Sequence, residues 1–587
     1  MDITQVIRAE VSKAVKALYE QDINEPEVLV NPTRKEFEGD YTVVVFPFTK
    51  AAKKAPPAVA EELGIYLTEH VDDISGFNVI KGFLNLNIND AYWSKFLSGI
   101  AAQENYGVSA PNGKKVVIEY SSPNTNKPLH LGHVRNILLG WSMSRIHEMA
   151  GYDVKRVQII NDRGIHICKS MVAWKKYGEG RTPESLGRKG DHVVGDYYVL
   201  YSNEEKEQRA ALEEAGHCDE EPAILKEARE MLIKWEANDP ETRKLWETMN
   251  GWVYAGLEET YKNLGVYFDK IYYESETYLL GKDAIQKGLD KNIFYKKDDG
   301  SVWIDLEDAK LDHKLVLRSD GTSVYMTQDI GTAQERQKDH EMDKSMYVVG
   351  NEQDHHFKVL FEILKRLGEP YADNLYHLSY GMVELPDGKM KSREGTIVDA
   401  DDLMEEVINV AKEESVERGD VSDLPEARRE EIWRRIGMAA LKYHIIRVTP
   451  RKRIVFDPKE SVDIQGQSGP FIQYSYVRTS SVLQKAGDWD VDILMYQNPK
   501  PQEKELLTMI RRYSDVIADA VKNYDPSLVA NYAYELAKSY NKFYHDIPIL
   551  KAESEEAKGF RLTLTQVVGK LLTSTLDLIG IEVPERM

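Results

Sequence analysis

Two histidines, His130 and His133, stand three residues apart where a predicted strand gives way to a predicted helix. Residues 116–120 are mostly apolar and β-branched, which indicates a buried strand. Residues 121–128 are rich in serine, asparagine and proline, which indicates a polar turn, and helical spacing begins at Leu131. The first N–H groups of a helix have no intrahelical partner and point outward. This arrangement therefore predicts an anion site with two imidazoles at its mouth.

Further strand-to-loop junctions predict the sheet that must position these histidines. Residues 157–164 form a second predicted strand with a polar end, and residues 345–350 form another that leads into a polar loop and a helix. In a doubly wound sheet, ligands bind beyond the carboxyl ends of the strands, which is where Gln353 stands. Tyr325 and Asp329, four apart in a predicted helix, share one helix face.

A glycine-rich basic segment at residues 381–395 is the next candidate for chemistry. Its centre is Lys389-Met390-Lys391-Ser392, and the three glycines around it predict a loop. Taken alone, the pattern is also typical of an exposed basic turn.

The composition is that of a globular protein with several domains. At about 150 residues per domain, 587 residues suggest three or four. The net charge of −21 is unlike that of a generic nucleic-acid binder, although local basic patches on an acidic body still hold structured RNA. Cys168 and Cys218 are too few for a disulfide framework and lack metal-ligand spacing.

The sequence shows neither a signal peptide nor an apolar segment long enough to span a bilayer. We therefore expect a cytoplasmic protein without a membrane partner. We also expect no resident metal site, no DNA partner and, since nothing demands a dimer, a monomer.

Hydrophobic periodicity predicts a multidomain α/β chain. Residues 1–108 form an expected α+β domain, and residues 109–435 a Rossmann-like domain with a doubly wound parallel sheet. A charged helical insertion near residues 179–250 interrupts the second domain. Residues 436–587 form an expected all-α helical bundle.

Within the first domain, the pattern predicts a helix from Ile3, a strand at residues 41–48, a helix at 58–70 and a hairpin at 77–88. Within the last domain, Asp525-Pro526 is a typical N-cap and first-turn pair for a long helix.

The string Ser-Pro-Asn-x-x-Lys-Pro-x-His-x-Gly-His-x-Arg, residues 122–135, resembles the first signature of class I aminoacyl-tRNA synthetases. Its Asn-x-x-Lys-Pro beginning is similar to that of the arginyl-tRNA synthetases. Residues 389–392 resemble the second signature, Lys-Met-Ser-Lys-Ser, in the order that this class has. Residues 1–108 resemble the N-terminal domain of the arginyl family, and residues 466–478 and 584–587 resemble its anticodon-binding domain, so the resemblance covers essentially the full chain.

The resemblance implies that ATP, assisted by Mg²⁺, activates L-arginine to an adenylate, and that the arginyl group then passes to tRNA(Arg). The carboxylate of the amino acid attacks the α-phosphate, so the enzyme positions groups and stabilises charge without a nucleophile of its own. The implied catalytic residues are Lys127, His130, His133, Lys389 and Lys391. The implied ATP-binding residues are His130, Gly132, His133, Lys389, Met390, Lys391 and Ser392.

The second signature departs from the class pattern at its fourth position, where Ser392 replaces lysine. Many arginyl enzymes share this departure, and a lysine just ahead of His-x-Gly-His is thought to replace the missing one. Lys127 stands at that place, and we favour Lys127 and Lys389 as the main catalytic cations.

Specificity for arginine requires a carboxylate, because a guanidinium is a planar fork that pairs with an anion through two hydrogen bonds. The pocket implied by the resemblance consists of Glu119, Asn124, His130, Tyr325, Asp329 and Gln353. Asp329 is the candidate for the guanidinium. Glu119 binds either the α-amino group or the guanidinium of arginine. Alternatively, it is a carboxylate at the end of a strand that forms a structural pair with another residue of the protein.

The resemblance also implies contacts with tRNA by Phe83, Asn85, Tyr474 and Met587. Phe83 and Asn85 fall where the family places an aromatic ring and an amide against the D-loop. Alternatively, Phe83 is an inward-facing strand residue.

Three other functions remain open from the sequence. A class I synthetase for another amino acid, such as a cysteinyl enzyme, would usually carry zinc ligands. If the protein were a nucleotidylyltransferase, the helical last third of the chain would have no function. A catalytically inactive RNA-binding protein would have no need of the intact residues Lys127, His130, His133 and Asp329.

Overall fold

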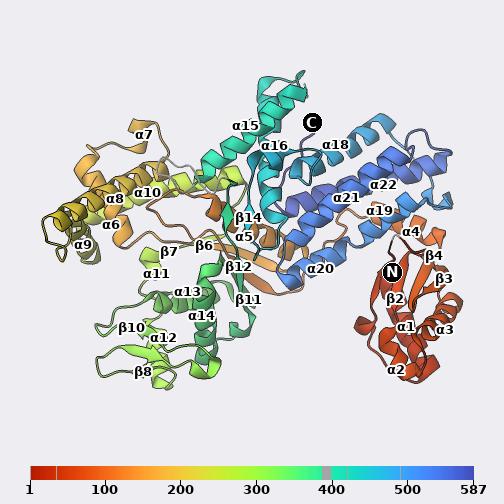
Figure 1. Ribbon diagram of the computed structural model, residues 1–587, viewed down its shortest axis with the longest axis horizontal. Coiled ribbons are helices and arrows are strands. Elements are labelled where there is room, and N and C mark those ends of the chain that lie inside the picture. The colour runs from red at the N-terminus through yellow and green to blue at the C-terminus, as the bar shows by residue number, and fades with distance from the viewer. Residues whose placement is uncertain (1, 35, 387–397, 419–420, 490) are drawn as a thin grey trace. The chain divides into compact units, whose positions relative to one another are not determined.

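The computed structural model describes residues 2–34, 36–386, 398–418, 421–489 and 491–587, and this part of the chain forms two compact units (Figure 1). The N-terminal–helical unit comprises Met1–Val108, Phe471–Val516 and Tyr532–Thr575. The parallel-sheet unit comprises Ser109–Pro470, Ile517–Asn531 and Leu576–Met587.

The N-terminal module is α+β, as its sequence predicts. Antiparallel strands in the order β1-β2-β4-β3 pack against α1 and α3. Their bounds are α1 Ile3–Tyr19, β1 Val30–Pro32, β2 Tyr41–Val44, α3 Pro56–His70, β3 Ile74–Ile80, β4 Phe83–Ile88 and α4 Asp90–Ala101. Lys81 and Gly82, both with positive φ, form the tight turn of the β3–β4 hairpin.

The strand predicted at residues 41–48 is too long. Strand β2 ends at Val44, and Phe46–Phe48 form a 3₁₀ turn with proline near its start. Proline fixes φ and has no N–H to give to a sheet, so Pro47 favours a turn over a longer strand.

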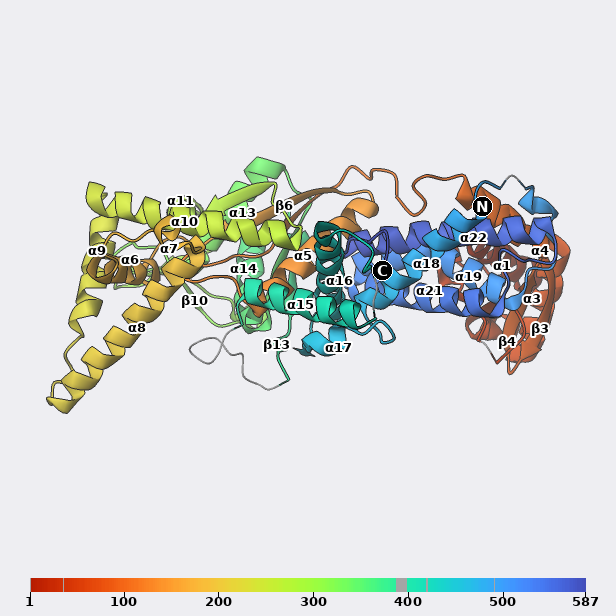
Figure 2. The same ribbon diagram turned by 90° about the horizontal axis from the view of Figure 1, so that it is seen from above.

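Helices make up the rest of the N-terminal–helical unit, where α18, α21 and α22 run beside one another (Figure 2). The helices are α18 Gly469–Ala486, α19 Pro501–Arg511, α21 Ser527–Asp546 and α22 Glu555–Leu578, whereas α20 Tyr513–Asn523 belongs to the parallel-sheet unit from residue 517 onward. The predicted cap is present, because Asp525 accepts a 3.0 Å hydrogen bond from the N–H of Ser527.

A buried arginine joins the N-terminal module to these helices. The Arg511 side chain, 6% exposed, donates to Asp2 (2.9 Å), Thr4 (3.1 Å) and Asp515 (2.7 Å). Its guanidinium also lies 5.7 Å from the ring centre of Tyr41. The beginning of the chain is thus held by a residue near its end.

The parallel-sheet unit is built on parallel strands in the order β12-β11-β5-β6-β7. The strands are β5 Lys115–Glu119, β6 Asp153–Ile160, β7 Lys270–Tyr273, β11 Lys344–Gly350 and β12 Leu375–Tyr380. The strand order reverses between β11 and β5, which marks the point where a doubly wound sheet opens a crevice. The predicted fold class is confirmed.

The helices of this unit connect the strands and surround the crevice. Helix α5 (Leu131–Met149) joins β5 to β6, α13 (Tyr325–His340) leads into β11, and α14 (Asp354–Leu367) follows it. Between β6 and β7 lies the predicted helical insertion, seen edge-on in Figure 2. Its helices are α6 Ile165–Tyr177, α7 Pro183–Leu186, α8 Gly190–Glu214, α9 Ala223–Glu236 and α10 Pro240–Leu264.

Helices α15 (Ala400–Arg418) and α16 (Glu426–Ile446) pack against each other in the parallel-sheet unit. The domain boundary drawn from the sequence after residue 435 therefore falls inside α16. The apolar spacing that suggested a separate helical domain already begins in this helix.

Arg135, the last residue of the first signature, is a structural tie. Its side chain is fully buried and donates to the backbone carbonyls of Gly381 (2.6 Å), Met382 (3.2 Å), Pro450 (2.8 Å) and Lys452 (2.8 Å). Burial lowers the pKa of Arg135 to about 10, which leaves it charged at neutral pH. The guanidinium thus binds α5 to the segment just before the second signature.

We expect Arg135→Lys to destabilise the protein, because an ammonium group cannot reach the carbonyls that the planar fork satisfies. Each buried carbonyl left without a donor costs about 1–3 kcal/mol, so the free energy of unfolding should fall by about 2–4 kcal/mol. Urea unfolding followed by circular dichroism measures the change. Arg145→Lys on the same helix, whose partner Glu148 lies 3.2 Å away at the surface, is the control. Equal losses in the two variants would contradict the assignment.

Candidate active site

The candidate active site lies at the carboxyl ends of the parallel strands. Glu119 ends β5, Asp162 follows β6, Glu274 follows β7, and Gln353 follows β11. Because the strands are parallel, their carboxyl ends meet at one edge of the sheet. Helix α13 runs back along the sheet into β11, so its first turns, with Asp329, reach the same edge.

The two histidines of the first signature hold each other in a defined tautomer. His130 is the N-cap of α5, and its Nδ1 accepts a 3.1 Å hydrogen bond from the N–H of Gly132. The N–H of His130 donates in turn to Nδ1 of His133 at 3.2 Å, and the ring centres lie 3.9 Å apart. Since each Nδ1 accepts, the proton of each neutral ring sits on Nε2.

Burial keeps both imidazoles neutral. It lowers the pKa of His130 to about 4, with the nearby charge of Lys127 acting in the same direction and Asp399 opposing it. Burial also holds the pKa of His133 well below its ordinary value. At neutral pH the pair therefore presents Nε2–H donors, and the neutral rings do not need a carboxylate partner.

Gly132 leaves the space that the His130 ring occupies. A Cβ at residue 132 would lie 3.0 Å from Cε1 and 3.1 Å from Nδ1 of His130. Any larger residue would push the ring away from the helix start, so the backbone bond to Nδ1 depends on glycine.

The predicted lysines fall into two groups. Lys127 is half-buried in the turn before α5, and burial lowers its pKa. Its charge also acts on both histidines, which places it close to them. Lys389, Met390, Lys391 and Ser392 lie outside the described residues.

Glu119 is buried and paired. Its carboxylate forms an ion pair with Arg336 of α13 and accepts a 3.0 Å hydrogen bond from Ser122. The Arg336 guanidinium lies 5.4 Å from the ring centre of Tyr272 and 5.5 Å from that of Tyr347. The structural pair that the sequence left open for Glu119 therefore exists.

The other predicted pocket residues differ in exposure. Asp329 is half-buried, and its Oδ2 lies 2.6 Å from Nε2 of His356 at the start of α14. Tyr325, the first residue of α13, is 77% exposed. Asn124 and Gln353 are also exposed, and Asn124 bridges to Asn161 beyond the end of β6.

Two carboxylates at this edge were not predicted as site residues. Glu274 follows β7, and burial raises its pKa to about 7, with Asp162 and Asp329 adding to the effect and Arg163 opposing it. Asp162 is buried and accepts hydrogen bonds from Tyr254 (2.8 Å) and from the N–H (2.8 Å) and hydroxyl (2.7 Å) of Ser275. In the sequence, Glu274 could have been recognised as an acidic residue that directly follows a short strand, β7.

The residues predicted to contact tRNA lie on separate surfaces. Phe83 is 38% exposed and packs edge-on against Phe46 at 5.1 Å, so the inward alternative for Phe83 is wrong. Asn85 is buried, accepts from Thr42 (2.6 Å) and donates to Asn78 (2.9 Å).

In the helical part, Tyr474 is exposed and lies under the Arg478 guanidinium, 4.9 Å from the ring centre. Met587 packs against an apolar cluster of α15 and α16 that includes Ile432 and Ile436.

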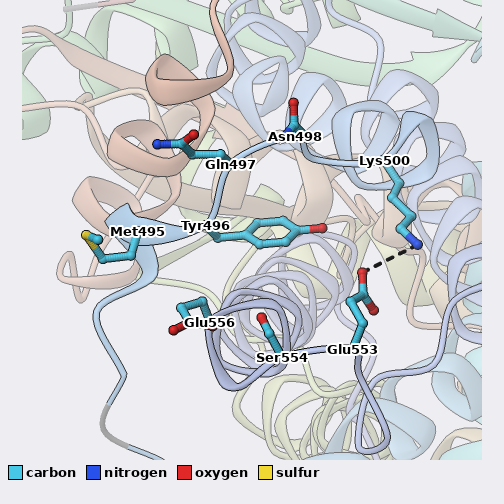
Figure 3. A pocket seen from close by; sticks show the side chains of 8 residues that line it. All are labelled: Met495, Tyr496, Gln497, Asn498, Lys500, Glu553, Ser554 and Glu556. Atoms are coloured by element: carbon cyan, nitrogen blue, oxygen red, sulfur yellow. Dashed lines mark ion pairs between the residues drawn. The ribbon is translucent and has the colours of Figure 1, made fainter.

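A separate surface pocket lies in the N-terminal–helical unit (Figure 3). The Tyr496 ring spans it, and Lys500 faces Glu553 at 3.4 Å across one end. Lys500 and Glu553 pair across it, and neither histidine of the first signature lines it.

Comparison with known families agrees with this arrangement. Residues 97–457 match the model described as tRNA synthetases class I (R), catalytic domain. Residues 472–587 match the DALR anticodon binding domain, and residues 3–88 match the arginyl tRNA synthetase N terminal domain.

The full chain is 53% identical to a protein named arginine–tRNA ligase in Bacteroides thetaiotaomicron, covering 100% of both chains. It is 49% identical to the protein of that name in Porphyromonas gingivalis, again over 100% of both. Among solved structures, the arginyl-tRNA synthetase of Thermus thermophilus has the same fold, with a TM-score of 0.81, 24% identity and 100% of both chains covered. In the part of the chain that the structure describes, no helix has the length and apolarity to cross a membrane.

We expect Arg336→Met to destabilise the protein, because it leaves the Glu119 carboxylate buried beside apolar and aromatic groups. Breaking such a pair typically costs about 3–5 kcal/mol, whereas replacing both partners costs far less. Denaturant unfolding should therefore show that the double variant Glu119→Gln/Arg336→Met regains stability over the single one. Arg318→Met, at an exposed position, is the control. A double variant less stable than Arg336→Met would contradict the pairing.

Proposed function

This chain belongs to the arginyl-tRNA synthetase family and joins arginine to tRNA, and we propose that it activates L-arginine with ATP in the strand-end crevice. One observation carries the proposal. The Nε2–H donors of His130 and His133 and the carboxylates of Asp329 and Glu274 belong to the same edge of one sheet. Such an edge offers donors for a triphosphate beside anions for a cationic side chain.

The chemistry that we propose needs no nucleophile from the protein. The arginine carboxylate attacks the α-phosphate of ATP, arginyl-adenylate forms and pyrophosphate leaves. His130 and His133 would donate their Nε2–H groups to phosphate oxygens, Gly132 would admit the nucleotide, and Lys127 would add positive charge. A single well-placed donor in such a site lowers the barrier by roughly 3–4 kcal/mol. A hydroxyl at the 3′ end of tRNA(Arg) then attacks the acyl carbon of the adenylate, an ester bond forms and AMP leaves.

The second signature extends this proposal. Lys389, Met390, Lys391 and Ser392 stay predicted contacts with the nucleotide, on the resemblance alone. Mg²⁺ would enter with the triphosphate, held through phosphate oxygens and water as this ion usually is. The imidazoles and Lys127 suit the anion and not the metal ion, which is consistent with a metal carried by the substrate.

For the arginine side chain, we propose that Asp329 and Glu274 accept the guanidinium N–H groups. Two carboxylates match a donor fork, whereas lysine has a single compact ammonium. Nε2 of His356 lies 2.6 Å from Oδ2 of Asp329, so the Asp329 carboxylate would interact with both His356 and the substrate. Glu119, Asn124, His130, Tyr325 and Gln353 complete the pocket that we propose. A site of this polarity rejects apolar analogues by about 10⁴-fold or more, so no editing site is required.

For tRNA we propose three contacts, one in each predicted domain. They are Phe83 in residues 1–108, the acceptor end at the crevice of residues 109–435, and Tyr474 with Met587 in residues 436–587. Asn85 would act indirectly, since its bonds to Thr42 and Asn78 stiffen the sheet face that carries Phe83. We also propose that the protein is a cytoplasmic monomer and that it binds neither DNA nor a resident metal ion.

The arginine pocket is tested by Asp329→Asn, which keeps the shape and removes the charge. Loss of a charged hydrogen bond costs about 1.5–3 kcal/mol, so the KM for arginine should rise about 10- to 150-fold while the KM for ATP changes little. Arginine-dependent pyrophosphate exchange and tRNA charging measure this. Glu335→Gln is the control, because Glu335 is a partly exposed residue of the same helix and pairs with Lys338 at the surface. A normal KM for arginine in Asp329→Asn would exclude the assignment.

Glu274 should make arginine binding depend on pH. Burial raises the pKa of Glu274 to about 7, so its carboxyl group is largely protonated at pH 6 and largely ionised at pH 8. A bound guanidinium favours the ionised form, so affinity should increase as pH rises through 7. The KM for arginine should be about tenfold lower at pH 8 than at pH 6.

Glu274→Gln should raise the KM and abolish this pH dependence. Glu276→Gln, two residues away and exposed, should keep it. A pH profile that survives in Glu274→Gln would show that another group titrates.

A further inference from the structure

A cluster of charged side chains lies beside the histidine pair, and the activation chemistry above does not use it. Lys189 and His192 stand at the start of the insertion helix α8, and Asp399 and Asp401 at the start of α15. Nε2 of His192 lies 3.3 Å from Asp399 and 3.4 Å from Asp401. Lys189 pairs with Asp401, the side chains of which are 13% and 24% exposed.

The cluster is anchored from the insertion side. Lys189 also donates to Thr260 of α10 at 2.5 Å and lies 3.2 Å from Asp191, which is fully buried. Thr260 in turn donates to Asp401 at 3.1 Å. Asp191, His192 and Asp401 are near enough together to bind a cation, but the Lys189 ammonium already supplies positive charge there.

On its other side, the cluster is continuous with the His130 backbone. Residues 398–400 pair with residues 129–131: Leu131 donates its N–H to Val398 (3.0 Å), and Ala400 donates to Leu129 (3.0 Å). His130 and Asp399 are the bridged residues of this antiparallel contact. The strap, defined here as residues 398–400, therefore lies directly along the helix start that fixes both imidazoles.

We propose that His192 and Lys189 are positioning residues that hold the strap against His130 and so keep the histidine pair in place for ATP. The insertion between β6 and β7 thereby acts on the nucleotide site without touching the nucleotide. This inference rests on the proposed role of His130 in binding ATP.

The charges explain why cations are needed at these two positions. Asp399 stands beside His130 and raises the pKa of that imidazole, in opposition to burial and Lys127. An unpaired carboxylate there would also repel a triphosphate. The carboxylates of Asp399 and Asp401, which lie 3.3 and 3.4 Å from Nε2 of His192, raise its pKa to about 10, so His192 is an imidazolium at neutral pH and compensates their charge.

The test compares His192→Gln with His192→Lys in the full-length protein, using arginine-dependent pyrophosphate exchange with tRNA present. Glutamine removes the positive charge and lysine restores it. His192→Gln should raise the KM for ATP about tenfold and leave the KM for arginine within about twofold, and His192→Lys should recover most of the loss. His217→Gln is the matched control, because His217 forms an exposed pair with Glu220 in the same insertion.

Asp401→Asn provides a second variant if His192→Gln folds poorly, and thermal unfolding separates stability from positioning. An unchanged KM for ATP in folded His192→Gln or Asp401→Asn would overturn the inference, as would failure of His192→Lys to recover it. His130→Asn is measured in parallel. If its KM for ATP is normal, the proposed nucleotide site itself fails. If it rises while that of His192→Gln does not, only the positioning inference fails.

Discussion

Two backbone N–H groups at the start of α5 decide what the histidine pair can do. Each donates to a ring Nδ1, and this fixes both protons on Nε2 and turns two buried neutral rings into hydrogen-bond donors. Everything around the pair serves to keep that arrangement. Strand β5 and the polar turn set the helix start at the sheet edge, and Gly132 leaves space for the His130 ring. Arg135 and residues 398–400 bind the two flanks of the second-signature segment to the same helix.

The protein contains its own example of arginine recognition. Arg336 is buried with a carboxylate on one side and two tyrosine rings nearby, a combination that suits a planar, delocalised and weakly hydrated cation. At the same edge, the side chains of Asp329 and Glu274 are half-buried, and we propose above that they accept the guanidinium of the substrate. On that proposal, the difference in burial separates a permanent ion pair from carboxylates that a substrate can reach. Burial raises the pKa of Glu274, and the charge of Arg163 opposes this effect while Asp162 and Asp329 add to it.

The sequence predicted what depends on neighbours along the chain. The strand, turn and helix around His130, the doubly wound parallel sheet and the cap at Asp525 all follow from local patterns, and each is present. Features that depend on distant partners were missed. The residues near Glu119 in the sequence do not indicate that it pairs with Arg336, which lies more than two hundred residues away. The hydrogen bond from Arg135 to the carbonyl of Pro450 spans an even longer separation. Glu274 was missed because a four-residue strand gives a weak periodic signal, and Pro47 shortened a strand that β-propensity favoured.

The contact of Arg511 with Asp2, Thr4 and Tyr41 bears on how this chain is made. The N-terminal module leaves the ribosome first, and its core strands and helices can assemble from local segments. The guanidinium that pairs with Asp2 is synthesised about 500 residues later, which takes about 25–100 s at about 5–20 residues per second. Until then the surface around Asp2 and Tyr41 stays uncovered in the nascent protein. The N-terminal–helical unit is thus completed near the end of translation, after the strands of the parallel sheet, which lie between its first and second segments in sequence, have emerged.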